Sequence, residues 1–328
     1  MRYIVYGAGA VGSAVGGLLS YAGKSVNFIG RKPHIDAINK NGLQLNSYEE
    51  TMIAKPSGVY SIKHIVPQKD DVIFLCVRTN DTKNAVNDII EFYPKDTPIF
   101  AFQNSVVNEK ILSKYFSNVY GVAVKMTCYS PESGITNFRS IGRLVLGKYP
   151  LGTDAKVKTT ANDLISAGFE VSISENIMQD KWLKLAINAV SSVSAIFMNE
   201  EISRDDVNRV KVMLLEEIQL VLSAANISSV PCEKKDKDIP ALIDSFRLPA
   251  ELYRPKIPVY NSTWTALNRG TKLENKYYLG IIIELSEKHN LSAHICSKIL
   301  QMCDYLETHK YSPTFYGPED IEEVLRLA

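Results

Sequence analysis

Short apolar runs alternate with helical patterns along the first half of the chain. Runs with the character of strands cover residues 3–6, 25–29, 71–77, 97–102 and 119–126. Continuous apolar strands that are separated by helices are typical of a parallel sheet covered on both faces. The pattern therefore predicts an α/β fold with a doubly wound sheet.

The segment 130–147 breaks this alternation, because proline and glycine residues interrupt it. We interpret it as antiparallel strands that complete the sheet. A helix over 154–167 and a strand over 169–174 then end the first domain.

After residue 175 strand patterns almost vanish and helical periodicity takes their place. The sequence predicts helices over residues 181–198, 205–225, 258–268, 272–289 and 293–310. The stretch 231–240, rich in Lys and Asp, is expected to be a solvated connection. We therefore predict two domains, a nucleotide-binding α/β domain over residues 1–175 and an all-helical domain over residues 176–328.

Composition and charge limit the class of protein. The chain has 328 residues, of which 45% are hydrophobic and 22% charged, as in ordinary globular proteins. A net charge of +1 gives no field that would recruit nucleic acid or an anionic membrane. No apolar run is long enough to span a bilayer. The five cysteines form no CxxC pair and the chain starts with strand-like residues, so we expect a cytoplasmic protein without a signal peptide.

The loop after the first predicted strand carries the motif Gly7-Ala8-Gly9-Ala10-Val11-Gly12. The first glycine permits a tight turn, the second lets the backbone approach a pyrophosphate, and the third lets the following helix pack closely on the strand. Free N–H groups at the start of that helix favour phosphates. A glycine-rich turn without a ligand is the alternative. The position between a strand and a helix favours a dinucleotide site in a Rossmann-type fold.

The second predicted strand ends at Ile29-Gly30-Arg31-Lys32. A site for NAD normally has Asp or Glu here, which binds the ribose 2′-hydroxyl, and this chain has none. A carboxylate would repel a 2′-phosphate, whereas the guanidinium of Arg31 can pair with it through two hydrogen bonds. We therefore predict NADP(H) as the cofactor. The alternative is a surface turn that Arg31 and Lys32 merely cap.

The apolar helix over residues 182–190 contains a lysine. Lys184 and Asn188 are four residues apart, and Ser191 and Ser192 follow one turn later, so all four share one stripe of the helix. Periodicity alone leaves two interpretations of Lys184 open. In a cleft, partial desolvation would make it a proton donor to a carbonyl oxygen during hydride transfer. At the surface, it would be an ordinary lysine with its charge in water.

Other polar residues are weaker candidates in isolation. Gln103-Asn104-Ser105 ends a predicted strand, at the edge where ligands bind in this fold, although Asn is also common in turns. Glu274 lies early in a predicted helix, where an acid also suits the helix dipole. No metal site is expected, because helical spacing does not bring four ligands together from the candidates His289, His294, Cys296 and Cys303.

Taken together, these residues resemble the ketopantoate reductase family (2-dehydropantoate 2-reductases) over essentially the whole chain. The order and spacing of the matching segments make the match specific. The segments are Gly7-Ala8-Gly9-Ala10-Val11-Gly12, Arg31, Gln103-Asn104, Lys181-Trp182-Leu183-Lys184-Leu185-Ala186-Ile187-Asn188, Ser262 and Glu274. That family joins a Rossmann domain to a helical domain. It reduces 2-dehydropantoate to (R)-pantoate with NADPH, a step of pantothenate biosynthesis.

The resemblance implies two catalytic residues and several that bind the substrate. Lys184 would be the general acid that protonates the developing alkoxide, and Glu274 would hold a substrate hydroxyl. Asn188 would help to orient the substrate, and Ser262 would contact its carboxylate. Ser192 takes a position that also belongs to the substrate site.

The resemblance also implies a set of cofactor residues. The loop from Gly7 to Gly12, including Ala8, Ala10 and Val11, would bind the pyrophosphate. Arg31 would bind the 2′-phosphate, and Arg78 stands where the family often has a lysine for the same phosphate. Asn104 would lie beside the nicotinamide ribose and the substrate. A homodimer is left open.

Five positions depart from the family pattern. Ser192 stands where the family usually has a second active-site asparagine, and Ser105 replaces the glycine that commonly follows Gln-Asn. Ala266 and Lys276 stand where aspartates are typical, and Leu279 replaces an asparagine. The pair Lys184 and Glu274 is retained, which supports the reaction type and leaves the substrate open.

Three hypotheses of function follow. The first is NADPH-dependent reduction of a 2-keto acid to a 2-hydroxy acid, with 2-dehydropantoate as the substrate. The second is a related reductase for a different keto acid or an imine, which the changes at Ser192, Ala266 and Lys276 would support. The third is a sensor that binds NADPH without turnover. Retention of both Lys184 and Glu274 argues against the third.

Overall fold

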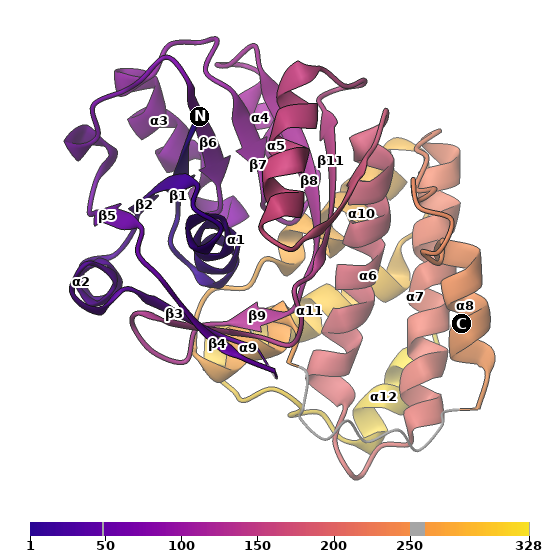
Figure 1. The fold of residues 1–328 in the computed structure, drawn as a ribbon. Helices are drawn as coiled ribbons and strands as arrows, with labels where there is room; N and C mark the ends of the chain where they lie inside the picture. Colours follow the sequence, from indigo (N-terminus) through magenta and orange to yellow (C-terminus); the bar gives the residue numbers. More distant parts are fainter. Residues whose placement is uncertain (48, 250–259, 328) are drawn as a thin grey trace. The chain divides into compact units, whose positions relative to one another are not determined.

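The computed structural model of the chain describes residues 1–47, 49–249 and 260–327. The chain divides into two compact units, unit 1 (Met1–Lys181) and unit 2 (Trp182–Ala328). The division falls inside one helix, α6 (Ile177–Phe197). Figure 1 draws the chain from its indigo N-terminus to its yellow C-terminus.

Unit 1 is built on an eight-stranded sheet with the order β12-β11-β8-β7-β6-β1-β2-β5. Neighbouring strands pair in parallel, except that β11 runs antiparallel to β8. The strands are β1 (Arg2–Tyr6), β2 (Ser25–Ile29), β5 (Ser57–Val59), β6 (Asp71–Leu75), β7 (Ile99–Ala101), β8 (Val119–Lys125), β11 (Arg143–Lys148) and β12 (Glu170–Ile173). The predicted doubly wound α/β sheet is confirmed.

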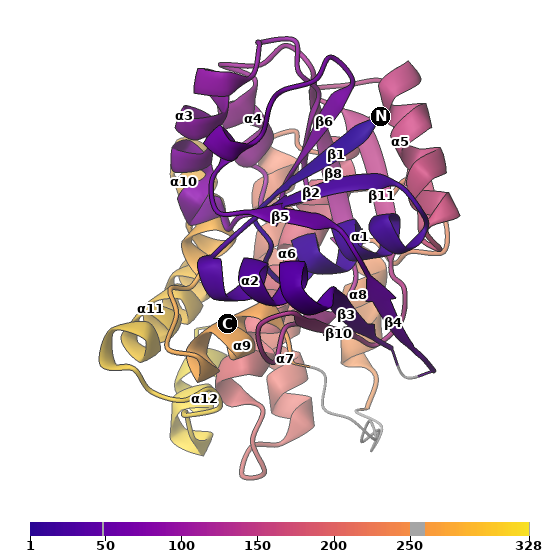
Figure 2. The same ribbon diagram turned by 60° about the vertical axis from the view of Figure 1, so that its left-hand side comes forward.

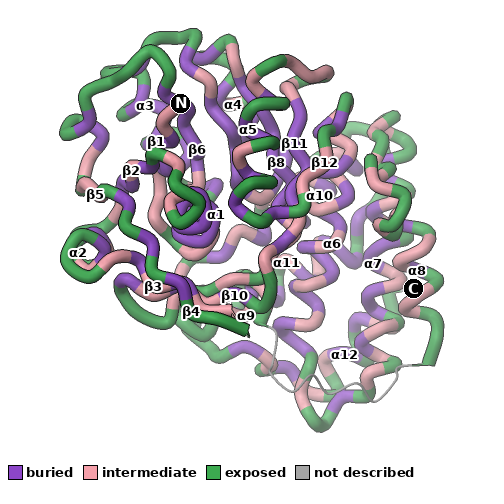
Figure 3. Tube along the Cα trace, in the orientation of Figure 1, coloured by how far each residue is buried: buried purple, intermediate pink, exposed green. Residues whose placement is uncertain are grey.

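Helices cover both faces of this sheet. Successive strand residues point to opposite faces, so Tyr3 and Val5 join the apolar core beneath α1 and α5, whereas Ile4 joins the core beneath α3 and α4. Burial on both faces explains the continuous apolar strands of the sequence, and Figure 3 shows β6 buried along its length. The helices of unit 1 are α1 (Ala10–Tyr21), α2 (Lys32–Asn41), η1 (Ile62–His64), η2 (Thr79–Asp81), α3 (Thr82–Phe92), α4 (Asn108–Leu112) and α5 (Ala155–Ser166).

A second sheet, with the order β4-β3-β10-β9, lies in the same unit. Its strands are β3 (Leu43–Asn46), β4 (Thr51–Ala54), β9 (Cys128–Tyr129) and β10 (Ile135–Phe138), and Figure 2 shows β3, β4 and β10 together. The prediction that all of 130–147 completes the main sheet is therefore wrong for β10, which pairs in parallel with β3. Phe138 of β10 belongs to the core beneath α1, and burial of this ring favours the second sheet.

The described part of unit 2 contains helices and no strand. Helix α7 contacts α8, α10, α11 and α12, and its buried residues, among them Val207, Val210, Leu214 and Ile218, recur at helical spacing. The predicted helical second half is confirmed. Its elements after α6 are α7 (Arg204–Ala224), α8 (Ile239–Arg247), α9 (Ser262–Asn268), η3 (Asn275–Tyr277), α10 (Leu279–Lys288), α11 (His294–His309) and α12 (Pro318–Leu325).

Some predicted bounds in unit 2 need correction. One helix over 272–289 is wrong: a 3-10 turn, η3, comes first, and α10 begins only at Leu279. The expected connection over 231–240 ends at α8, which Asp238 starts by accepting a hydrogen bond from Ala241 N. The helix predicted over 258–268 corresponds to α9, which begins at Ser262. Residues 258 and 259 of the predicted range lie outside the described residues. Among the described helices, none is both long and apolar enough to cross a membrane.

Candidate functional site

The glycine loop has the backbone geometry that its motif predicts. Gly7 has φ +109°, and a Cβ atom there would lie 2.7 Å from Val77 N. A Cβ atom on Gly12 would lie 2.2 Å from Gly7 O, whereas one on Gly9 would meet nothing within 4 Å. Gly7 and Gly12 are therefore required by the packing of the loop itself. Gly9, the N-cap of α1, faces open space in which a ligand can approach the backbone.

Three predicted cofactor elements lie at one edge of the main sheet. Strand β1 pairs with both β2 and β6, so Tyr6 lies opposite Ile29 on one side and Leu75 on the other. The glycine loop follows β1, Arg31 follows β2 and Arg78 follows β6. The structure thus brings the loop and both arginines to the carboxyl ends of adjacent strands, where ligands bind in open α/β sheets.

The two cations after β2 differ in their surroundings. Lys32 forms an ion pair with Asp36 at 2.9 Å, and its Nζ lies 5.0 Å from the ring centroid of Tyr60. Arg31 is the exposed N-cap of α2, and its guanidinium has no ion pair or hydrogen bond to the residues that the structure describes. Arg31 is therefore the cation of this pair that an anion can engage.

His34 connects this cation to the glycine-loop helix, and the sequence did not point to it. Its Nδ1 accepts a hydrogen bond from Gly134 N at 3.0 Å, so the ring proton lies on Nε2, which is 3.0 Å from Ser13 Oγ on α1. Burial, and then the charge of Arg31, lower the pKa of His34. A neutral imidazole therefore holds the first turns of α1 and α2 together.

A buried polar network fixes the chain after β7. The carbonyl of Asn104 accepts hydrogen bonds from Asn108 Nδ2 at 2.7 Å and from Thr79 Oγ1 at 3.2 Å. Gln103 Nε2 donates to Thr82 Oγ1 at 2.7 Å. The half-buried side chain of Asn104 makes no hydrogen bond to residues 1–47, 49–249 or 260–327. The backbone of Asn104 is held, and its carboxamide is left for a ligand.

Ser105, the next residue, has φ +76° and a buried side chain. This left-handed conformation favours glycine. The departure from the family pattern at this position therefore places a side chain where the backbone conformation suits glycine.

Lys181 is the buried lysine of α6, and its role was missed from the sequence. Its side chain is 3% exposed, and its Nζ donates to the carbonyl of Gln103 at 2.9 Å and pairs with the carboxylate of Glu109, which is 0% exposed. Glu109 lies 72 residues earlier in the chain, so no local pattern announces the pair. Lys181 thus holds the backbone of the Gln103–Asn104 turn through a hydrogen bond.

Three predicted substrate residues follow one another along α6. Lys184 is half-buried, Asn188 is buried and Ser192 is fully buried. The Nδ2 of Asn188 has no hydrogen-bond partner among the described residues. A buried amide without a partner is costly, which suits a donor that is reserved for a ligand.

Helix α6 also holds the elements that carry Ser262 and Glu274. Asn261 caps α9 by accepting from Trp264 N and donates through Nδ2 to Ser191 O at 2.9 Å, next to the exposed Ser262. Glu274, half-buried, directly precedes η3. The structure therefore ties both elements to the helix that carries Lys184.

The departures from the family pattern in unit 2 lie mostly in its interior. Ala266 is 5% exposed, Leu279 is 0% exposed, and Ser192 has no exposed surface. Lys276 is exposed, with its Nζ 5.0 Å from the ring centroid of Tyr277. These changes alter the packing of unit 2 more than its surface.

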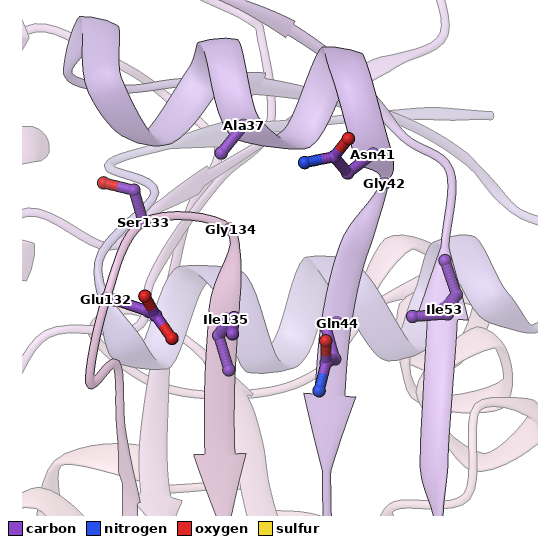
Figure 4. Close-up of a pocket in the computed structure, with 9 residues that line it drawn as sticks. All are labelled: Ala37, Asn41, Gly42, Gln44, Ile53, Glu132, Ser133, Gly134 and Ile135. Atoms are coloured by element: carbon purple, nitrogen blue, oxygen red, sulfur yellow. The ribbon is translucent and has the colours of Figure 1, made fainter.

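A cavity of about 250 Å³ lies beside the second sheet of unit 1. Side chains of α2, β3, β4 and the segment before β10 face it (Figure 4). No residue predicted to bind cofactor or substrate lines this cavity. Over the described ranges, no three His, Cys, Asp or Glu side chains gather in a way that could hold a metal ion.

Two family models match the chain, one in each half. The model described as ketopantoate reductase PanE/ApbA matches residues 3–150. The model described as ketopantoate reductase PanE/ApbA C terminal matches residues 176–307. Together the two matches cover most of the sequence.

Curated relatives align along nearly the whole chain. The 2-dehydropantoate 2-reductase of Pyrococcus horikoshii is 29% identical over 297 residues, covering 89% of this chain and 93% of the relative. The 2-dehydropantoate 2-reductase of Pyrococcus abyssi is 27% identical over 293 residues, with the same coverage of 89% and 93%.

Solved structures share the fold. A PanE/ApbA family ketopantoate reductase from Ralstonia eutropha JMP134 has a TM-score of 0.80 at 23% identity, covering 94% of this chain and 99% of that one. D-mandelate dehydrogenase in a ternary structure with NADH and anilino(oxo)acetate has a TM-score of 0.80 at 22% identity, with coverage of 94% and 99%. At these identities the likeness concerns the fold alone.

Proposed function

Because the chain belongs to the ketopantoate reductase PanE/ApbA family, we propose that it reduces a 2-keto acid to a 2-hydroxy acid with NADPH. We propose 2-dehydropantoate as the substrate and (R)-pantoate as the product. The family expected from the sequence is confirmed, and its curated relatives bear the name of this reaction. We assign cofactor binding to the domain of residues 1–175 and substrate binding to that of residues 176–328.

One observation carries this proposal. In unit 2, the helix with Lys184 and Asn188 is hydrogen-bonded to α9 and η3, next to Ser262 and Glu274. These four side chains supply a cation, a carboxamide, a hydroxyl and a carboxylate. They match a substrate that has a keto group, a carboxylate and a hydroxyl.

Each group has one task in the proposed reaction. When bound, NADPH supplies the hydride that reduces the keto carbon. Lys184 gives its Nζ proton to the oxygen that becomes the alcohol. Asn188 and Ser262 orient the substrate through hydrogen bonds, and Glu274 accepts one from its hydroxyl. Ser192, buried behind Asn188, supports this set.

The preference for NADPH rests on the edge of the main sheet. The residues after β2 include no acid, and Arg31 has no ion pair in the described parts of the chain. Arg78 follows the adjacent strand β6. Arg31→Ala should therefore weaken NADPH binding by about tenfold, a typical loss for one charge-assisted phosphate contact, and leave NADH binding unchanged. Titration of cofactor fluorescence measures both affinities, and equal NADPH affinity in the variant would contradict the proposal.

A different 2-keto acid is the second candidate. The exposed Lys276, which stands where the family pattern has an aspartate, favours it. D-mandelate dehydrogenase, which shares the fold and was solved with NADH and anilino(oxo)acetate, suggests an aromatic acid as the compound to test. A non-catalytic NADPH sensor is the third candidate, and it would need neither Lys184 nor Glu274.

The deciding experiment follows the absorbance of NADPH with purified protein and 2-dehydropantoate, and with an aromatic 2-keto acid in parallel. Lys184→Ala should lower kcat by about 10²- to 10⁴-fold, as expected for loss of a general acid. Lys288→Ala, at an exposed lysine of α10, is the matched control and should retain full activity. Turnover of the aromatic acid alone would select the second candidate. NADPH binding without any turnover would select the sensor.

A further inference from the structure

Four side chains of unit 2 form a hydrogen-bonded group around Asn275, which we call the Asn275 hub. Asn275 is 1% exposed. Its Nδ2 donates to Ser192 Oγ on α6 at 2.7 Å and contacts Cys303 Sγ on α11 at 3.4 Å. Its Oδ1 accepts from Thr263 Oγ1 on α9 at 3.4 Å. One carboxamide in η3 thus joins three helices.

Members of the hub are neighbours of the residues that we assign to the substrate. Thr263 follows Ser262 in the chain, and Asn275 follows Glu274. The hydroxyl of Ser192 donates to the carbonyl of Asn188 at 3.2 Å. The hub therefore fixes the backbone beside each of these three substrate residues.

A second contact fixes the other side of Glu274. The carboxylate of Glu307 on α11 accepts a hydrogen bond from Leu273 N at 2.7 Å. Leu273 precedes Glu274 and Asn275 follows it, so both neighbours of Glu274 are anchored, the first to α11 and the second to three helices. These anchors hold the backbone on both sides of Glu274.

Apolar packing alone would not achieve this. A buried carboxamide is unfavourable unless its donors and acceptor are satisfied. A satisfied network fixes one arrangement, because hydrogen bonds are directional and apolar contacts are not. The Nδ2 and Oδ1 of Asn275 are both engaged, so the side chain is committed to the interior and does not reach a substrate.

The hub also gives a physical account of Ser192. This serine stands where related sequences usually have an asparagine, and its shorter side chain receives a carboxamide from η3. We propose that Asn275 is a positioning residue that supplies, from η3, the carboxamide missing from α6. It thereby sets selectivity for 2-keto acids whose hydroxyl binds Glu274. This inference rests on the proposed reductase function.

The test compares two substrates that differ by one hydroxyl, 2-dehydropantoate and 3,3-dimethyl-2-oxobutanoate. Asn275→Leu keeps the number and branching of the side-chain heavy atoms and removes the hydrogen bonds of the hub. The ratio of kcat/KM for the two substrates should fall by about tenfold, because a misplaced Glu274 no longer recognises the hydroxyl. A general loss of folded protein lowers both values equally and leaves the ratio unchanged.

Two further variants sharpen the result. Ser192→Asn combined with Asn275→Leu returns a carboxamide to α6 and should restore most of the ratio. Asn199→Leu is the matched control, because Asn199 also bonds within unit 2, to the carbonyls of Thr314 and Tyr316, but not to the hub. It should leave the ratio unchanged. If Asn275→Leu does not fold, Thr263→Val removes one hub bond and should lower the ratio by a smaller factor.

An unchanged ratio in folded Asn275→Leu, with active wild-type protein, overturns the hub proposal and leaves the reductase intact. A wild-type protein that reduces neither substrate overturns the assignment of 2-dehydropantoate as the substrate. In that case amide hydrogen exchange tests the hub directly. Residues 273–278 should exchange at least tenfold faster in Asn275→Leu than in wild type or Asn199→Leu, and equal rates would overturn the hub.

Discussion

The proposed cofactor edge of unit 1 and the proposed substrate residues of unit 2 are built by different means. At the sheet edge, backbone conformation forms the site: Gly7 has a positive φ, and Gly12 is too close to Gly7 O for any side chain. In unit 2, side-chain hydrogen bonds link α6, which carries Lys184 and Asn188, to α9 and to η3, which follows Glu274. A short motif can encode the first kind of site. The second kind depends on contacts that span most of a domain.

The two units also treat a buried lysine differently. Lys181 in unit 1 pairs with Glu109 and donates to a carbonyl. Lys211 on α7 is 6% exposed, lies 3.5 Å from Asn208 Oδ1 and has its Nζ 5.1 Å from the ring centroid of Phe246. Its hydrogen bonds and ring contact to the described residues include no carboxylate. We therefore expect Lys181 to stabilise the fold and Lys211 to destabilise it.

The largest expected effect on stability comes from removing the ion pair between Lys181 and Glu109. Lys181→Met leaves the carboxylate of Glu109 buried without its cation, and should lower the free energy of unfolding by about 3–5 kcal/mol. Lys181→Met combined with Glu109→Gln should lose clearly less, because no charge stays buried. Urea unfolding at pH 7 measures both. Equal losses in the two variants would show that the pair is not the source of the stability.

The second effect has the opposite sign. Burial, and then the charge of Arg204, lower the pKa of Lys211 from 10.5 to about 8. Above pH 10.5 Lys211 is neutral in both states, and its burial then costs no charge. As the pH falls towards 8, the free energy of unfolding decreases by about 3 kcal/mol, at roughly 1.4 kcal/mol per pKa unit. Lys211→Met should raise the free energy of unfolding by up to about 3 kcal/mol at pH 7. The gain should disappear near pH 10.5, and a gain independent of pH would contradict this account.

The third effect separates the glycines of the cofactor loop. Gly12→Ala should lower the free energy of unfolding by about 1–3 kcal/mol through overpacking against Gly7 O. Gly9→Ala should leave stability unchanged, because its Cβ meets open space, but should weaken NADPH binding. Thermal unfolding with and without NADPH distinguishes the two. Stabilisation of Gly9→Ala by NADPH as large as that of wild type would argue against a pyrophosphate at this residue.

The smallest effect concerns Ser105. Replacing this residue with glycine relieves a left-handed conformation at φ +76° and should raise the free energy of unfolding by about 1 kcal/mol. Urea unfolding checks the value, with Ser113→Gly in a helix C-cap of ordinary φ as the control. A loss of stability in Ser105→Gly would mean that its hydroxyl contributes more than the strain costs.

Local patterns predicted much of the fold. The strands β1, β2, β6, β7 and β8 were predicted because each contains a short, mostly apolar run, whose large side chains the structure buries. The second sheet was not found, since β3 and β10 are short, pair in parallel and lie about ninety residues apart. The helix α12 was also not predicted, being only eight residues long. In this chain, an element could be predicted where its pattern is local, and not where it depends on residues far apart in the sequence.

The same distinction applies to the candidate site. The glycine loop and Arg31 could be proposed as cofactor residues from the sequence, because a few adjacent residues carry the pattern. Lys181 and Asn275 were not singled out, because their partners Glu109 and Ser192 are 72 and 83 residues away. A local sequence pattern does not contain these distant partners, so it gives no reason to place the lysine or the asparagine in the interior.

The ion pair at Lys181 has a consequence for dividing the gene. A fragment that ends at residue 175, where the strand pattern stops, would contain Glu109 but not Lys181. A fragment that ends at residue 181 would contain both and would cut α6 after its first turn. Chimaeras that exchange the second half with that of a relative should therefore be joined inside α6. Unit 1 ends at Lys181, several residues after its last strand, β12.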